Sequence, residues 1–267
     1  MRPYNTRKHS KITKKQIQKQ PQKQPQKQPQ MQKQNSKKPV EVEYEGRFLD
    51  INPEDIRAKA KALGGHMKAP LTLYRRSVFK LCDMERGFVR VRDEGIKTTM
   101  TAKIFRNKDF PEEYELDIKD KFEAGQAFLR ALNLTEKAYH ETIREKWFIP
   151  RRIGSASELC ELTIDYIPGL PAYSEIECKT KSDLHRACKL LEVKYSDLVF
   201  GGYGNVFVHY YGMAAKDIND SIPRLTFKGV KDEIGAYVHK NRDILETAAK
   251  QGLEIFNKII TKSKEIT

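Results

Sequence analysis

The sequence predicts an α+β protein in which a closed β-barrel encloses a polar lumen and helices pack on the outside. Charged and apolar residues alternate with a period of two in segment after segment, as they do along a β-strand. Other segments carry apolar residues at helical spacing on one face. With 267 residues and 39% hydrophobic content, the chain is long enough for one large domain or two small ones.

The clearest alternation lies in residues 41–48. One face would carry Glu41, Glu43, Glu45 and Arg47, and the other Val42, Tyr44, Gly46 and Phe48. Taken alone, this pattern is typical of an exposed strand with a solvated charged face. We expect strand one to end at Ile51, and further strands at 71–81, 88–92, 99–104, 113–118, 140–147, 161–165 and 175–179. Arg75 and Arg76 are adjacent, so the sequence leaves open which of them shares a face with the acids.

Helices are predicted between these strands. Asn52 is a suitable N-cap with Pro53 at the first helical position, and Gly64 follows the expected end at Leu63. We expect further helices over 119–132, after a Ser182 cap, and over 231–262.

The repeated alternation is more informative than any single strand. An open sheet could wet its charged face, whereas a closed barrel would turn that face inward. Buried charge is costly unless it is paired or binds a metal. Such a lumen would suit a highly charged ligand. The face would carry the acids Glu43, Glu45, Glu113, Glu115, Glu161, Asp165, Glu175 and Glu177, and the bases Arg47, Arg90, Arg92, Lys103, Arg144 and Lys146.

The two kinds of charge indicate a metal-bound polyphosphate. Clustered carboxylates suit Mg²⁺ or Mn²⁺, which prefer oxygen ligands. Rows of Arg and Lys suit phosphate oxygens. A divalent ion can activate water or polarise a phosphoryl oxygen. The sequence gives no strong sign of a covalent nucleophile.

The net charge of +14 belongs mainly to one end of the chain. Residues 1–38 hold 12 Lys or Arg and no acid, whereas residues 39–215 hold 28 of each sign. We expect 1–38 to be a disordered Lys/Gln/Pro-rich tail, either a nonspecific contact for nucleic acid or another polyanion or a solubilising extension. Residues 39–215 would form the barrel domain and 216–267 a helical extension that caps the barrel or faces a partner.

The cysteines and the hydropathy favour a cytoplasmic, reducing location. Cys82, Cys160, Cys178 and Cys188 show no CxxC spacing, so we expect free thiols rather than zinc ligands. No apolar run is long enough to span a membrane, and no secretory signal is evident. We therefore expect no membrane partner.

The ordered motifs between about residues 40 and 213 resemble the CYTH domain of the triphosphate tunnel metalloenzyme superfamily. Glu43-x-Glu45-x-Arg47 is similar to its ExExK signature, with Arg in place of Lys. Run 161–177 is similar to members described as class IV adenylyl cyclase-like. The remaining matches are Arg90-x-Arg92, Thr101-x-Lys103, Glu113-x-Glu115, Arg144, Asp165 and Glu175-x-Glu177. Pro111 and Thr142 stand where many members carry a base.

The resemblance implies an eight-stranded antiparallel tunnel that acts on a triphosphate with Mg²⁺ or Mn²⁺. Catalysis would depend on Glu43, Glu45 and Glu177 through metal-activated water. The implied metal ligands are Glu43, Glu45, Asp165, Glu175 and Glu177, and the implied phosphate-binding residues are Arg47, Arg90, Arg92, Lys103, Arg144 and Lys146. The other lumen acids would be Glu113, Glu115 and Glu161.

The strand motifs leave the reaction open. We expect a hydrolase of inorganic, nucleoside or thiamine triphosphate. The alternatives are an adenylyl cyclase that makes cyclic AMP from ATP, an RNA 5′-triphosphatase, and a polyphosphate- or RNA-binding module without catalysis. Hydrolase and cyclase differ in whether water or the ribose 3′-hydroxyl attacks.

Overall fold

The computed structural model describes residues 44–81, 87–104, 112–150, 159–214 and 216–265. All of them belong to one unit, residues 40–267. The predicted tail, and with it Glu41 and Glu43, lies outside the described residues.

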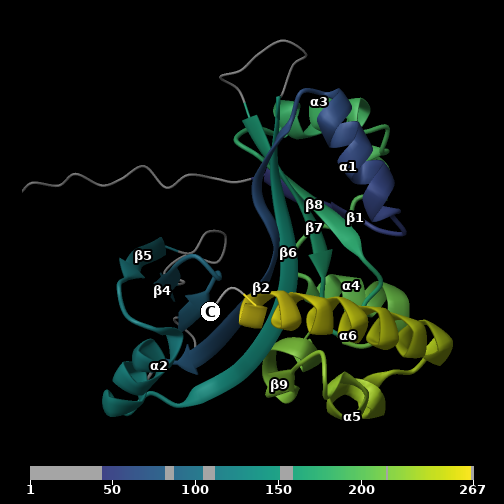
Figure 1. The fold of residues 1–267 in the computed structure, drawn as a ribbon. Helices are drawn as coiled ribbons and strands as arrows, with labels where there is room; N and C mark the ends of the chain where they lie inside the picture. Colours follow the sequence, from purple (N-terminus) through teal and green to yellow (C-terminus); the bar gives the residue numbers. More distant parts are fainter. Residues whose placement is uncertain (1–43, 82–86, 105–111, 151–158, 215, 266–267) are drawn as a thin grey trace, which may run out of the picture. The chain divides into compact units, whose positions relative to one another are not determined.

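The fold is α+β and is built on one large sheet (Figure 1). Its strands are β1 (Tyr44–Phe48), β2 (His66–Lys80), β3 (Gly87–Asp93), β4 (Thr98–Ile104), β5 (Glu112–Ile118), β6 (Glu136–Pro150), β7 (Leu159–Tyr166), β8 (Tyr173–Cys178) and β9 (Arg224–Leu225). The order is β1-β8-β7-β6-β2-β3-β4-β5, with every neighbouring pair antiparallel. The two-residue β9 runs parallel to β6.

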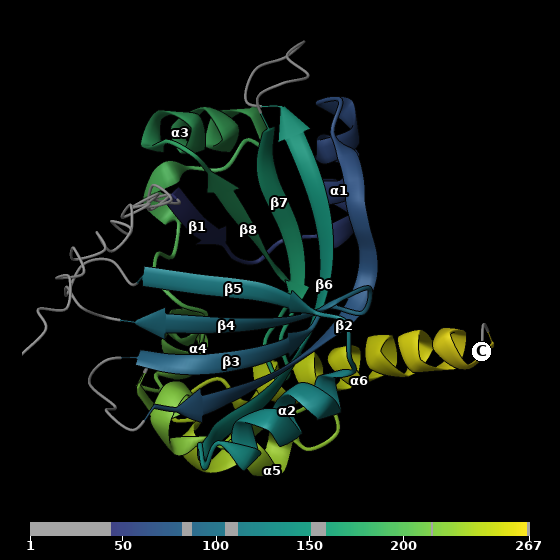
Figure 2. The same cartoon turned by 90° about the vertical axis from the view of Figure 1, so that its left-hand side faces the viewer.

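The long strands β2 and β6 connect two halves of the sheet. Residues 143–150 of β6 pair with β7, whereas residues 75–80 of β2 pair with β3. The ladder between β2 and β6 has register shifts, which are local irregularities that bend a strand and increase its twist. Figures 1 and 2 show the consequence: the sheet bends about β2 and β6, and β4–β5 turn away from β7–β8.

Six helices are described in the structure, and four of them pack on the apolar side of this bent sheet. The six are α1 (Pro53–Ala62), α2 (Phe122–Ala131), α3 (Lys181–Leu190), α4 (Gly204–Tyr211), α5 (Val230–Ile234) and α6 (Arg242–Glu265). Short helical turns occur at Tyr195–Asp197, Asp217–Ser221 and Gly235–Tyr237. Helices α1 and α3 pack with β1, β7 and β8, α2 packs on β2 and β3, and α6 packs on β2 and β6. No described helix is both long and apolar enough to cross a bilayer.

The N-termini of the helices test the capping predictions. Asn52 does cap α1, because its Oδ1 accepts a hydrogen bond from the Glu54 amide at 2.9 Å. The predicted Ser182 cap of α3 is wrong: Thr180 fills this role, and its hydroxyl accepts from the Asp183 amide at 3.1 Å. Thr180 precedes the helix with extended backbone, as a capping residue does, whereas Ser182 already lies inside it.

The sequence predicted a closed barrel. In the structure, however, the described residues of β1 and β5 form no ladder with one another. The backbone N–H and C=O of Arg47 instead bond to Val199, at 3.0 and 2.7 Å. This segment approaches β1 closely, since a Cβ on Gly46 would lie 2.8 Å from Leu198 Cδ1. At Arg47, the outer edge of β1 is thus occupied by the chain that leads into α4.

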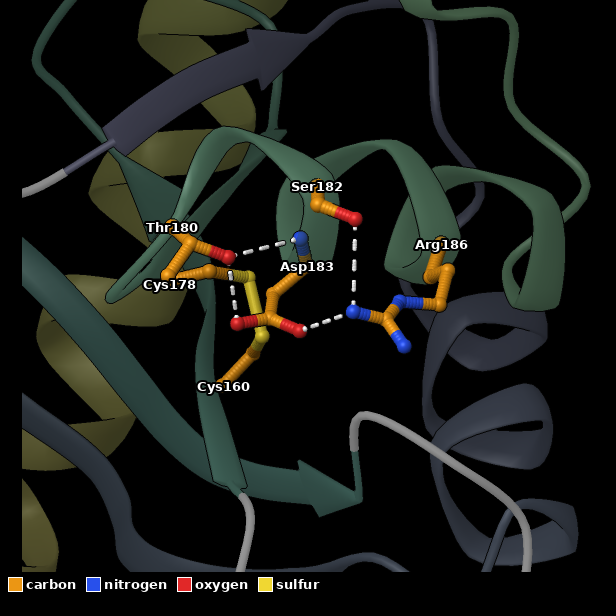
Figure 3. The surroundings of a disulfide bond; sticks show 6 residues. All are labelled: Cys160, Cys178, Thr180, Ser182, Asp183 and Arg186. Atoms are coloured by element: carbon orange, nitrogen blue, oxygen red, sulfur yellow. Dashed lines mark hydrogen bonds and ion pairs between the residues drawn. A yellow bond between two sulfur atoms is a disulfide. The ribbon is translucent and has the colours of Figure 1, made fainter.

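Cys160 and Cys178 form a disulfide (Figure 3), which contradicts the expectation of free thiols for these two residues. They are 18 residues apart, so no short sequence spacing marks the pair. The ladder aligns Glu161 with Glu177 and Leu162 with Ile176, which brings the two cysteines opposite one another at the end of β7 and β8. Cys188 is free and buried, and Cys82 lies outside the described residues.

We expect reduction of the Cys160–Cys178 disulfide to lower the free energy of unfolding by about 3 kcal/mol. Without the cross-link, the unfolded chain has more conformational entropy and is therefore more stable relative to the folded protein. Urea unfolding with and without dithiothreitol measures the change. In the double variant Cys160→Ala/Cys178→Ala, dithiothreitol should have no effect. Equal midpoints for the oxidised and reduced wild-type protein would contradict the prediction.

Candidate metal and phosphate site

The ladder registers place the predicted lumen residues on one face of the sheet. Residues directly opposite each other in an antiparallel ladder project from the same side. Glu45 lies opposite Glu177, and Arg47 opposite Glu175. The rows continue across the other strands through the pairs Glu161↔Glu177, Thr163↔Glu175, Arg144↔Asp165, Lys146↔Thr163, Arg90↔Thr101, Thr101↔Glu115 and Lys103↔Glu113. We call this side of the sheet the charged face.

Three carboxylates meet at the β1–β8 end of the charged face. One oxygen from each of Glu45, Glu175 and Glu177 lies within 4.8 Å of the others. Such a group of hard oxygen donors, with Glu175 only 6% exposed, fits a divalent cation such as Mg²⁺ or Mn²⁺. Glu43, the fourth predicted ligand from this end, lies outside the described residues.

Arg47 offsets part of the negative charge of this carboxylate group. Its Nη2 lies 3.3 Å from Glu45 Oε1 and forms an ion pair with Glu175. Its Nη1 donates to the carbonyl oxygen of Gly201. Burial raises the pKa of the Glu175 carboxyl, and Arg144 and Arg47 act against that rise. Burial disfavours the charged form of this carboxylate, and a bound cation would offset that cost.

Asp165, also predicted as a metal ligand, lies in a different setting. Arg144 donates to both of its oxygens, from Nε at 2.6 Å and from Nη2 at 2.7 Å. The Thr163 hydroxyl donates to Asp165 Oδ2 at 2.8 Å. Burial acts to lower the pKa of Arg144, but the carboxylates of Asp165 and Glu175 act to raise it. The net result is a pKa above the ordinary value. Fully buried Asp165 therefore holds Arg144 in place on the charged face.

The remaining predicted residues spread along the same face. Lys146 Nζ lies 3.0 Å from Glu161 Oε1. Arg90 Nη2 donates to the Thr101 hydroxyl at 3.2 Å, and that hydroxyl donates to Glu115 Oε2 at 2.7 Å. Glu113 is described by its backbone alone, which pairs with Lys103. Arg92 lies opposite Thr99, beyond this group.

Three residues that the sequence did not assign also belong to the charged face. Arg76 shares it, because Arg76 lies opposite both Arg92 and His140, whereas Arg75 pairs with Asp93 and Glu123 on the other side. The Arg76 guanidinium lies over the Tyr203 ring, 4.5 Å from its centroid. The Tyr203 hydroxyl lies 2.6 Å from His140 Nδ1. The sequence indicated that either Arg75 or Arg76 shares a face with the acids, but not which of the two. No pattern in the sequence pointed to Tyr203.

The segment 199–203 contacts both Arg47 on β1 and the strands that carry His140 and Arg76. It pairs with β1 at Val199, accepts from Arg47 at Gly201, and reaches β6 and β2 through Tyr203. Three strand spacings of about 4.8 Å separate β1 from β6, a distance that five extended residues can bridge. This segment positions Arg47 and Arg76 from the same side.

Comparisons with known proteins add distant structural relatives. No family model and no curated protein matches the sequence. Solved structures similar to this chain include the PH1012 protein from Pyrococcus horikoshii (20% identity, 61% of this chain and 97% of that one, TM-score 0.45). Another is described as a putative adenylate cyclase from Vibrio parahaemolyticus (12%, 62% and 98%, TM-score 0.49). A third, from Hippeastrum, is described as a putative adenylyl cyclase with a dominant triphosphatase activity (17%, 62% and 93%, TM-score 0.42).

The likenesses are distant, so the charged face itself carries the functional proposal below.

We expect Asp165→Asn to lower the free energy of unfolding by about 3–5 kcal/mol, because it removes the buried charge that accepts two hydrogen bonds from the Arg144 guanidinium. The variant should bind Mn²⁺ as tightly as wild type if Asp165 is only a partner of Arg144. Urea unfolding and Mn²⁺ calorimetry measure the two effects. Full stability with lost Mn²⁺ binding would instead make Asp165 a metal ligand.

His140 should make stability depend on pH. Burial, then Arg76, lowers its pKa to about 3, so the folded protein keeps the ring neutral while the unfolded chain takes up a proton near pH 6.5. This contribution is complete above pH 6.5 and is lost as the pH falls toward 3. From pH 7 to pH 5 it should cost about 2 kcal/mol.

The comparison for this prediction is His140→Gln, unfolded in urea at both pH values. The difference in stability between wild type and variant should shrink by that amount at pH 5. A difference that stays constant would mean that His140 is not held neutral.

Proposed function

We propose that this protein is a divalent-metal-dependent hydrolase of a triphosphate compound, of the CYTH type. The observation that carries the proposal is the carboxylate group Glu45, Glu175 and Glu177, whose oxygens converge within 4.8 Å. It lies on the same face of the sheet as the bases Arg47, Arg144 and Lys146. Convergent acids beside a row of bases suit a ligand that is both metal-bound and phosphorylated.

Each group on the charged face has a distinct role in this proposal. Glu45, Glu175 and Glu177 would hold the ion, together with Glu43. When bound, the ion would polarise a phosphoryl oxygen and lower the pKa of a water. Arg144, fixed by Asp165, and Lys146 would bind phosphate oxygens and offset the charge that develops on the leaving phosphate. A closed tunnel, in which β1 and β5 come together, would exclude bulk water from these groups and strengthen their interaction with phosphate.

The basic tail would have a separate role. With 12 Lys or Arg and no acid in residues 1–38, we propose that it makes a salt-sensitive, nonspecific contact with nucleic acid or another polyanion. Turnover of a small triphosphate should not require it.

A product assay decides among the reactions. Purified protein with Mg²⁺ or Mn²⁺ would be given inorganic triphosphate, ATP, thiamine triphosphate and a 5′-triphosphorylated RNA. Orthophosphate release from one of them supports a hydrolase and identifies its substrate class. Cyclic AMP with pyrophosphate from ATP would replace the hydrolase by a cyclase. Tight binding without any product would make the charged face a receptor for polyphosphate.

We expect Glu177→Gln to lower metal-dependent turnover by at least about 100-fold, because it removes a carboxylate ligand while keeping the size of the side chain. Mn²⁺ affinity, measured by calorimetry without substrate, should fall as well. Glu246→Gln on α6 is the control, since this exposed acid pairs with Lys231 away from the charged face. Unchanged turnover and Mn²⁺ binding in Glu177→Gln would contradict the metal assignment.

A further inference from the structure

Three aromatic rings from two segments form a short stack beside helix α3. The His185 ring of α3 stacks on the Tyr195 ring, with 3.6 Å between their centroids and 17° between their planes. The Phe200 ring lies next to Tyr195, with 5.5 Å between the centroids. Helix α3 packs against β1 and β8 (Figure 2), and it does so on the side of the sheet opposite to the charged face. The stack therefore lies outside the metal and phosphate site.

The pairing of residue 199 with β1 brings a fourth ring to this side. Arg47 pairs with Val199, and a Cβ on Gly46 would lie 3.3 Å from Phe200 Cε1. Tyr44, two residues before Gly46, projects from the same face of β1. Phe200 is 44% exposed and Tyr44 is 38% exposed. Because Phe and Tyr are usually buried to a greater extent, these two exposed rings indicate a contact surface.

Three lysines border the rings. Lys181 and Lys189 lie four residues to either side of His185 in α3, so all three share one face of the helix. Lys194 directly precedes Tyr195 in the chain. The three lysine side chains are exposed. The rings and the positive charges are thus interleaved.

The acids of this segment do not cancel its positive charge. Residues 179–200 hold five Lys or Arg and three Asp or Glu. Asp183, only 3% exposed, pairs with Arg186 at 2.8 Å. Glu192 pairs with Lys59 of α1 at 2.8 Å. Since two of the three acids already have a basic partner, the surface beside α3 is basic as well as aromatic.

This combination fits a single-stranded nucleic acid. Its bases stack on exposed aromatic rings, and its phosphates contact lysines. A duplex offers mainly its phosphates to such a surface, because its bases are stacked on one another. A lipid surface would require apolar side chains that enter the acyl region, whereas His185 and Tyr195 are polar. The same ligand class is proposed above for residues 1–38, which precede Tyr44 in the chain.

We propose that a surface beside α3 binds single-stranded nucleic acid. This surface, which we call the α3 surface, consists of Tyr44, Lys181, His185, Lys189, Lys194, Tyr195 and Phe200. The exposed rings would stack with bases while the lysines contact phosphates. His185 and Tyr195 would hold Phe200 in position. The α3 surface does not depend on the proposed hydrolase, because it lies on the other side of the sheet.

Binding of a labelled RNA of about 16 nucleotides, a length within the range of known single-strand sites, tests the α3 surface. The RNA carries a 5′-hydroxyl and is used in EDTA with the full-length protein, so neither a triphosphate nor a metal contributes. Phe200→Leu should weaken binding of the single strand about fivefold or more in fluorescence anisotropy, because base stacking is lost. Its affinity for a duplex of the same length should not change. Phe128→Leu is the matched control, since Phe128 is an exposed ring on α2.

The lysines are tested by the salt dependence of the same binding. Lys181→Gln/Lys189→Gln should reduce the slope of log affinity against log salt concentration by about 1.4, because two phosphate contacts are lost. Lys250→Gln/Lys258→Gln removes the same charge from exposed positions of α6, and it should bind the single strand as wild type does.

Three outcomes would overturn the α3 surface. One is no RNA binding by the wild-type protein at low salt. Another is a loss of binding in the Lys181→Gln/Lys189→Gln variant but not in Phe200→Leu, which would mean attraction of phosphates without stacking. The third is a loss of binding to phosphatidylserine vesicles but not to RNA in that lysine variant, which would indicate a membrane contact. None of them bears on the proposed hydrolase, whose substrate and metal are absent from the assay.

Discussion

Charge pairing across the β1–β8–β7–β6 ladders is the interaction on which the rest of the structure depends. The buried pair of Asp165 and Arg144 is complete, with two short hydrogen bonds and a third from Thr163. The group of Glu45, Glu175 and Glu177 brings three carboxylates together, with Arg47 beside Glu45 and Glu175 and with Arg144 Nη2 3.6 Å from Glu175 Oε1. A buried pair in which each charge is satisfied keeps the strands in register, whereas the carboxylates that converge next to it suit a cation.

The opposite side of the sheet fixes the same strands by other means. Glu145, only 3% exposed, receives hydrogen bonds from Arg57 of α1 at 3.0 Å and from the Trp147 indole at 2.6 Å. The Cys160–Cys178 disulfide covalently joins β7 and β8 one residue away from Glu161 and Glu177. Because a shift of one residue would move every side chain to the wrong face, these contacts on the apolar side protect the arrangement of the charged one.

Two rows of the charged face, Arg90–Thr101–Glu115 and Arg92–Thr99–Asp117, show that similar sequence patterns can have different outcomes on one face. The row of Arg90 ends in Glu115, whose carboxylate accepts a hydrogen bond from the Thr101 hydroxyl. The row of Arg92 ends in Asp117, which pairs with Lys97, and it retains unsatisfied atoms. The segment 199–203 adds to this difference by bringing Tyr203 to Arg76. The carboxylate group and the row of Arg76 and Arg92 thus lie on different strands of the charged face.

The sequence by itself determined the strands and their alternation, because a period of two depends only on local backbone geometry. It predicted that Glu45, Arg47, Glu175 and Glu177 would share a face, and the registers place them together. Only the tertiary structure decided which neighbours each charge meets: Arg144 with Asp165, Arg76 with Tyr203, and Cys160 with Cys178. These pairs lie 18 or more residues apart, so they depend on strand order and register, which no local pattern encodes.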